Sequence, residues 1–158
     1  MVEYKGFLYS DDYKMCIGKQ ISKTKEVVLH PDTEVICKEA FRDNEFIEKV
    51  IINCNLEKIC ECAFMGCKNL KEIEINSPNS VLIEPAVFLD TEIEKFISKS
   101  ILYYHYDLQL RFNAKHVELT CECTPDYDIF FSEDSKTASA EYVKVKTKNY
   151  VFENFICN

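Results

Sequence analysis

The sequence predicts a β-rich solenoid: a right-handed stack of coils with short parallel strands, short helical or 3-10 turns, and strands capping the C-terminal end. Phe41, Phe64 and Phe88 stand 23 and 24 residues apart, a spacing typical of stacked repeats. After each phenylalanine, apolar residues recur with a period of two, which indicates a short strand with one buried face. The residues expected on that face are Ile47, Val50 and Ile52, then Leu70, Ile73 and Ile75, then Ile93, Phe96 and Ser98. The segment around each phenylalanine predicts a short helical turn or an irregular crossing.

The composition is that of one folded, acidic domain. The chain has 158 residues, a formal charge of −8 and 47% apolar residues, so a single core is expected to fold without metal or disulfides. No stretch approaches the roughly 18–20 consecutive apolar residues of a membrane helix, and the first residues lack the pattern of a signal peptide. An acidic chain without a Lys/Arg-rich run does not match proteins that follow phosphate backbones. We expect no membrane insertion and no direct nucleic-acid binding.

The first two of three predicted regions carry the clearest pattern. Residues 1–26 are expected to form an N-terminal hairpin cap, with FLYS and MCI as strands and residues 10–14 as the turn. Residues 27–98 are expected to form the repeats, beginning with a strand around Val28.

The third region, residues 99–158, is expected to form a degenerate repeat and a strand-rich cap. Phe112 follows Phe88 by 24 residues, and alternating stretches occur at residues 142–145 and 150–152. Terminal repeats of a solenoid are atypical because one face must be capped. A small separate C-terminal domain is the alternative.

Two columns of charged residues test the alignment of the repeats. In both columns the sign of the charge changes at every step, so opposite charges face each other if equivalent residues stack one strand apart. Such pairs penalise a slip of register. The first column is Lys25, Glu48, Lys71 and Glu94, and the second is Glu26, Lys49, Glu72 and Lys95.

The repeat resembles a known family. A strand, an Ile-x-x-x-Ala-Phe step, Gly-Cys-x-x-Leu and a further strand are similar to the BspA-like class of leucine-rich repeat. Residues 59–75, ICECAFMGCKNLKEIEI, match best, and the resemblance covers about residues 5–98 when the hairpin is included. The resemblance implies a leucine-rich repeat stack, and it implies binding of another protein.

Nine cysteines favour a reducing cytoplasm, where all can remain thiols that pack as small apolar groups. The alternative is a bacterial cell surface or a secreted protein whose signal peptide has been removed, a location that the resemblance implies. Cys60 and Cys62 are separated by one residue, which does not match the Cys-x₂₋₄-Cys pairs of structural zinc sites. Cys37 and Cys60 fall at equivalent positions of consecutive repeats, where an adventitious disulfide is allowed and a required one is not expected.

No catalytic, metal or cofactor site is expected. His30, His105 and His116 lie far apart in the chain, and sequence spacing pairs none of them with a nucleophile. The chain lacks a Gly-rich phosphate loop, HExxH, GxSxG and EF-hand spacing. Two function hypotheses result. The first is a non-enzymatic protein-interaction module that binds through its strand face. The alternative is a small acidic intracellular inhibitor or regulator, encoded by a phage or mobile element, that blocks a nucleic-acid enzyme.

The candidate binding residues form two columns on the outward face of the strands. Three aliphatic residues pointing away from the core indicate a contact patch, because outward apolar groups add nothing to stacking. The alternative is that the C-terminal segment folds back and covers them. The central column is Val28, Ile51, Glu74 and Ile97, and its neighbour is His30, Asn53, Asn76 and Lys99.

Overall fold

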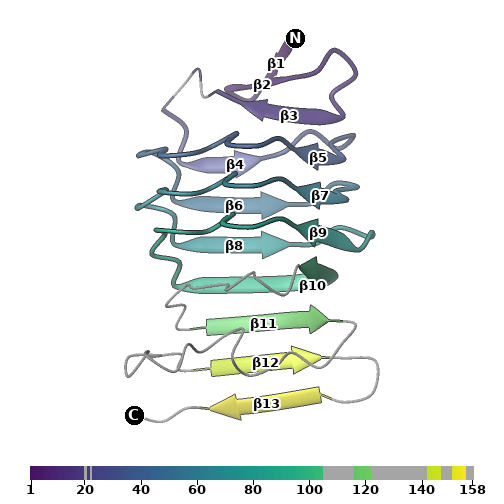
Figure 1. Cartoon of the computed structure of the whole chain (residues 1–158), viewed down its shortest axis with the longest axis vertical. Helices are drawn as coiled ribbons and strands as arrows, with labels where there is room; N and C mark the ends of the chain where they lie inside the picture. Colours follow the sequence, from purple (N-terminus) through teal and green to yellow (C-terminus); the bar gives the residue numbers. More distant parts are fainter. Residues whose placement is uncertain (20, 22, 105–115, 122–141, 147–150, 156–158) are drawn as a thin grey trace.

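Strands from consecutive coils stack in parallel along the whole length of the repeats (Figure 1). This computed structural model describes residues 1–19, 21, 23–104, 116–121, 142–146 and 151–155. The chain forms a β-solenoid of about four turns, as the spacing of the phenylalanines predicts.

Two sheets form two sides of the solenoid. The first sheet contains β4 (Glu26–Val28), β6 (Lys49–Ile52), β8 (Glu72–Ile75) and the first half of β10 (Lys95–Tyr104). The second sheet contains β5 (Val35–Ile36), β7 (Lys58–Ile59), β9 (Val81–Ile83) and the second half of β10. Each coil therefore contributes a strand to both sheets, and the sequence pattern had indicated only the first.

The third side of the solenoid corrects the expectation of helical turns: no helical residue occurs in the part of the chain that the structure describes. In the coils that contain Phe41 and Phe64, every second backbone N–H on this side donates to the following coil instead of bonding within its own segment. The N–H groups of Glu39, Phe41 and Asp43 donate to carbonyls of the next coil at 3.1, 2.8 and 2.8 Å. Glu39 and Asp43 also adopt φ of 56° and 54°, a left-handed conformation that ends a helix.

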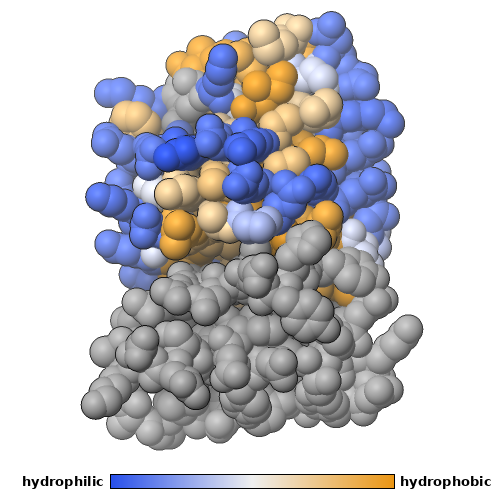
Figure 2. Space-filling view, in the orientation of Figure 1, coloured by the Kyte–Doolittle hydropathy of each residue, from blue (hydrophilic) through white to orange (hydrophobic). Residues whose placement is uncertain are grey.

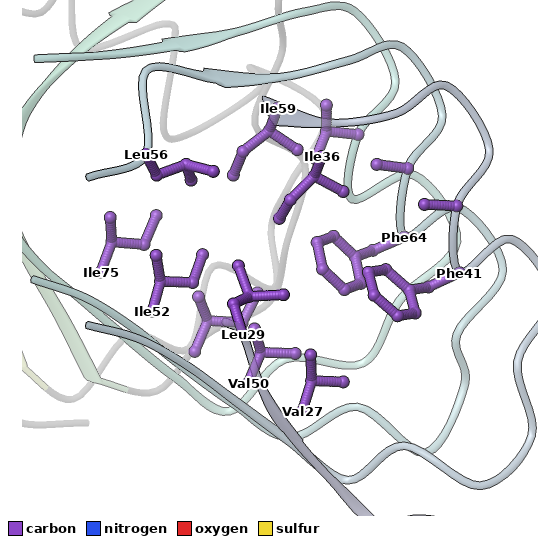
Figure 3. Close-up of a cluster of buried hydrophobic side chains, with 14 of the residues drawn as sticks. Val27, Leu29, Ile36, Phe41, Val50, Ile52, Leu56, Ile59, Phe64 and Ile75 are labelled. Atoms are coloured by element: carbon purple, nitrogen blue, oxygen red, sulfur yellow. The ribbon is translucent and has the colours of Figure 1, made fainter. Parts of the chain in front are cut away.

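The phenylalanine ladder is confirmed. The rings of Phe41 and Phe64 stack with centroids 4.8 Å apart, and those of Phe64 and Phe88 with centroids 5.8 Å apart. Phe7 and Phe96 close the two ends of this stack edge to face, at 5.3 and 5.6 Å. Figure 3 shows the phenylalanines on one side of the core and the aliphatic residues of the two sheets on the other sides.

The predicted inward residues of the first sheet are all buried. They are at most 3% exposed: Ile47, Val50, Ile52, Leu70, Ile73, Ile75, Ile93, Phe96 and Ser98. Within β10, the predicted Ser98 and the nearby Ser100 lie where the strand passes from the first sheet to the second. The Ser98 hydroxyl donates to the Ser100 carbonyl at 2.8 Å, and the Ser100 hydroxyl donates to the Ser77 carbonyl at 2.7 Å. Buried hydroxyls are thereby satisfied at the corner.

The N-terminal hairpin is also confirmed, and one more strand is added to it. β2 (Phe7–Tyr9) and β3 (Met15–Gly18) are antiparallel, and β3 pairs in parallel with β5. The unpredicted strand β1 (Val2–Tyr4) pairs with β2. Gly18, at φ 82°, lies so close to the next coil that an added Cβ would stand 1.8 Å from the Ala40 carbonyl oxygen. The hairpin therefore docks onto the first repeat backbone to backbone.

Three strands extend the stack at its C-terminal end, and the first of them pairs with both halves of β10. β11 (His116–Cys121) pairs in parallel with β10, β12 (Tyr142–Lys146) pairs in parallel with β11, and β13 (Val151–Phe155) closes the sheet antiparallel to β12. Strand capping at this end is as predicted, whereas Phe112 and Tyr150 lie outside the described residues. The division into three regions remains a prediction, and β10 crosses its boundary at residues 98 and 99.

Candidate functional site

The outward face of the first sheet carries the columns that the repeat alignment predicts. Val28 pairs with Ile51, Ile51 with Glu74, and Glu74 with Ile97 in the strand register. Because side chains alternate along a strand, these residues point away from the core while Val27, Val50 and Ile73 point into it. The four members of the central column are half-buried.

Within each charge column, opposite charges on consecutive coils face each other, as predicted. Lys25 Nζ lies 2.6 Å from Glu48 Oε1, and Lys49 Nζ lies 3.2 Å from Glu72 Oε2. The hydrogen bond to Glu72, together with its charge, raises the pKa of the Lys49 ammonium, so Lys49 keeps its positive charge at neutral pH. Lys71 lies 3.9 Å from Glu94 and 2.8 Å from Glu92. The charges of these columns therefore largely neutralise one another.

Glu74 is the centre of a polar cluster between two aliphatic residues. Its Oε1 accepts a hydrogen bond from Asn76 Nδ2 at 2.8 Å, and Lys99 Nζ lies 3.8 Å from the same oxygen. Asn76 Nδ2 also donates to Asn53 Oδ1 at 2.8 Å. Asn76 and Lys99 thus contact Glu74, and Asn53 is linked to it through Asn76. Ile51 and Ile97 are its partners along the central column.

His30, the remaining predicted residue, is engaged elsewhere. Its ring stacks on Tyr13 with centroids 4.1 Å apart and meets Tyr4 edge to face at 4.8 Å. Its Nδ1 accepts a hydrogen bond from the Asp32 backbone N–H at 3.2 Å. His30 therefore joins the hairpin to the first coil.

A second outward apolar face went unpredicted. It lies on the second sheet, where Met15, Val35, Lys58 and Leu82 are successive partners in the register. Figure 2 shows apolar patches on the face that carries β5, β7 and β9, with hydrophilic residues between them and along both margins. The signal that could have found it is the recurrence of Val35 and Leu82 one residue before the inward Ile36 and Ile83.

The described residues offer no constellation for metal chemistry. Among them, no three His, Cys, Asp or Glu side chains gather closely enough to hold a metal ion. Burial raises the pKa of the Cys16 thiol to about 12 and that of the Cys67 thiol to about 11, which leaves both protonated at neutral pH. The described residues contain no helix that is long and apolar enough to span a bilayer.

Comparison with known proteins identifies the repeat. Residues 19–108 match the family model described as the BspA type leucine rich repeat region, in six copies. No curated protein and no solved structure matches the chain. The match includes the four central coils and the stacked phenylalanines, and it spans more than half of the sequence. The chain therefore belongs to the BspA-type leucine-rich repeat family.

Proposed function

We propose that the protein is a non-enzymatic interaction module that binds a partner protein through the outward face of the first sheet. Leucine-rich repeats of this kind typically mediate protein–protein interaction. The observation that carries the proposal is the column of half-buried aliphatic residues, Val28, Ile51 and Ile97, interrupted by Glu74.

The arrangement around Glu74 indicates what the partner presents. An interface is commonly apolar at its centre and polar at its rim. Here Ile51 and Ile97 offer apolar contacts, and the Glu74 carboxylate, held by Asn76 and Lys99, offers an acceptor between them. A partner with a basic side chain flanked by apolar residues fits this order of groups.

Two observations support an open face. The described strands of the C-terminal segment, β11 to β13, continue the first sheet at its edge and so do not lie across its outward surface. The flanking columns pair their charges, so this face does not concentrate the net charge of −8. An inhibitor that relied on negative charge would use another surface. The experiment below therefore also tests the alternative function, inhibition of a nucleic-acid enzyme.

The test compares two matched double variants as affinity baits. Ile51→Ser with Ile97→Ser alters the first sheet, whereas Val35→Ser with Leu82→Ser alters half-buried aliphatic residues on the second. Proteins that wild-type bait and the second-sheet variant retain, but the first-sheet variant loses, support the proposal. All four side chains are half-buried, so the two variants should lose similar unfolding free energy, and thermal denaturation checks that both remain folded.

Either of two results would overturn the proposal. The first is equal retention of partners by wild type and the first-sheet variant. The second is selective loss by the second-sheet variant. If both wild-type bait and the first-sheet variant retain a nuclease or polymerase equally well, the result would favour the acidic-inhibitor hypothesis instead.

A further inference from the structure

Two cysteines face each other across neighbouring strands of the second sheet. Ile36 and Ile59 are partners in the register of β5 and β7, and Cys37 and Cys60 follow them directly. The Cys37 N–H donates to the Cys16 carbonyl, and the Cys60 N–H donates to the Ile36 carbonyl, each at 2.9 Å. Consecutive coils therefore hold the two cysteines in register, about one strand spacing of ~4.8 Å apart.

Both thiols are reachable from outside. Ile36 and Ile59 are 0% exposed and point inward, so the next residue of each coil points outward. Cys37 and Cys60 are accordingly half-buried, whereas Cys16, Cys54 and Cys67 are buried in the core. A reagent in solution would meet Cys37 and Cys60 before the core thiols.

Cys62 is a natural control for this pair. It is also half-buried, but it lies on the third side of the solenoid at φ 58°. Its equivalents in the neighbouring coils are Glu39 and Ala86, which share its left-handed conformation with φ of 56° and 58°. Cys62 therefore has exposure similar to that of Cys60 without a thiol at the facing position.

Electrostatics distinguishes the two thiols. Partial burial raises the pKa of both, and the neighbouring Cys60 raises the pKa of Cys37 further. On Cys60 the Lys58 ammonium and a hydrogen bond from the Lys38 backbone act in the opposite direction, because both favour the thiolate, while the Glu84 carboxylate opposes them. Since the thiolate is the nucleophile in disulfide exchange, Cys60 is the better placed of the two to attack first.

We propose that Cys37 and Cys60 are a redox-modification site that forms a reversible disulfide between the first two full coils. The oxidant is another disulfide, such as a small-molecule disulfide. The Cys60 thiolate attacks one of its sulfurs and releases the first thiol. The Cys37 thiolate then attacks the Cys60 sulfur and releases the second. Cys37 and Cys60 together lose two protons and two electrons, and the oxidant becomes two thiols.

Geometry makes this disulfide a labile one. The strand spacing of ~4.8 Å lies within the Cα range of disulfides, about 4.4–6.8 Å, but it exceeds the usual Cβ separation of about 3.5–4.5 Å. Closing the bond must draw the two coils together locally. Strained or exposed disulfides are easily reduced and are the ones that serve regulation, so the site is suited to a reversible role. This inference is independent of the proposed partner-binding face.

The experiment treats the folded, fully reduced chain with oxidised glutathione at pH 8, followed by alkylation and mass spectrometry. The expected product has lost the mass of two hydrogen atoms, and digestion yields one cross-linked peptide pair that contains Cys37 and Cys60. Excess reduced glutathione should restore both thiols. The Cys62→Ser variant should give the same cross-link, while Cys60→Ser should stop at a glutathione adduct or remain unmodified.

Three results would overturn the proposal. One is a wild-type protein that accumulates only glutathione adducts on Cys37 and Cys60. Another is a cross-link that involves Cys62 or a core cysteine in place of this pair. The third is loss of the cross-link in Cys62→Ser. Circular dichroism of every variant before oxidation establishes that the chain tested is folded.

Discussion

The inside and the outside of the same coils repeat by different rules. Inside, each column repeats one kind of residue: Phe41, Phe64 and Phe88 stack ring on ring. Outside, the charge columns alternate in sign from coil to coil. Identical shapes stack well because each ring fills the same space above the last, whereas identical charges repel. The same period of 23 or 24 residues therefore aligns identical side chains in the interior and opposite charges on the exterior.

The two regions also differ in the energy that they contribute. A buried phenylalanine contributes several kcal/mol, because its loss removes apolar contact and leaves a cavity. An exposed ion pair contributes about 0–1 kcal/mol, because water and salt screen it. The interior thus stabilises the fold, and the exterior selects which strand register is adopted.

The largest expected effect tests the interior. Phe64→Ala should lower the free energy of unfolding by about 3–5 kcal/mol, since Phe64 is 0% exposed and lies between two stacked rings. Phe46→Ala is the matched control, because Phe46 is 40% exposed. Urea denaturation of both variants measures the difference. Equal losses in the two variants would contradict the ladder as the source of stability.

The junction between hairpin and repeats should show the next largest effect. Gly18→Ala should cost at least about 2 kcal/mol, because it adds the strain of a left-handed residue to a clash with the Ala40 carbonyl. Gly66→Ala should cost less. There the atom in the way, Asp43 Oδ1, belongs to a movable side chain, and Asp43 and Asp90 adopt similar φ of 54° and 57° in the flanking coils. Thermal denaturation should rank the two variants, and the reverse ranking would refute the backbone-to-backbone docking.

High pH provides a third test of the interior. Burial raises the pKa of Cys16 to about 12 and of Cys67 to about 11 from an ordinary 9.0. Above pH 9 the unfolded chain loses these protons while the folded chain keeps them, so stability falls as pH rises. At pH 10 each thiol should lower the free energy of unfolding by about 1.4 kcal/mol relative to pH 7. Urea denaturation at both pH values, with a reductant present, measures the loss.

The Cys67→Ala variant is the control for this measurement. Its own stability at pH 7 is lower, but the loss between pH 7 and pH 10 should shrink by about the 1.4 kcal/mol assigned to one thiol. An unchanged pH dependence would show that other groups cause the alkaline destabilisation.

The smallest expected effect tests the exterior. Lys49→Glu places a negative charge between Glu26 and Glu72 in the register, which should destabilise by about 0.2–1 kcal/mol. Adding Glu72→Lys should recover part of the loss, and raising the salt concentration should diminish both changes. A double-mutant cycle at low salt measures the coupling. Zero coupling would mean that alternation of sign does not fix the register.

The sequence predicts best those features that recur at long intervals. The phenylalanine ladder, the charge register and the β2–β3 hairpin could be predicted because each rests on a period or a clear turn. The strands β5 and β7 could not, because two residues with one inward side chain show no periodicity. The prediction of helical turns was wrong because hydrogen bonds to the next coil determine the backbone conformation of the third side. No local sequence pattern reveals these bonds.

The candidate site shows the same limit. Register placed Ile51, Glu74 and Ile97 in one column, as predicted from spacing alone. The position of His30 against Tyr4 and Tyr13 depends on how the hairpin folds over the first coil, which spacing does not encode. The binding role of the columns and the cytoplasmic location inferred from the cysteines remain predictions.

Alternation of charge also restricts how such a protein can change its length. Deleting one coil would bring Lys25 opposite Lys71, which creates one repulsive contact between like charges. The later pair in that column, Lys71 and Glu94, would keep its opposite charges. Deleting two coils would bring Lys25 opposite Glu94 and leave the order of signs intact. Gain or loss of repeats by recombination should therefore be better tolerated in even numbers, so that the exterior imposes a parity on a fold whose interior accepts any number of coils.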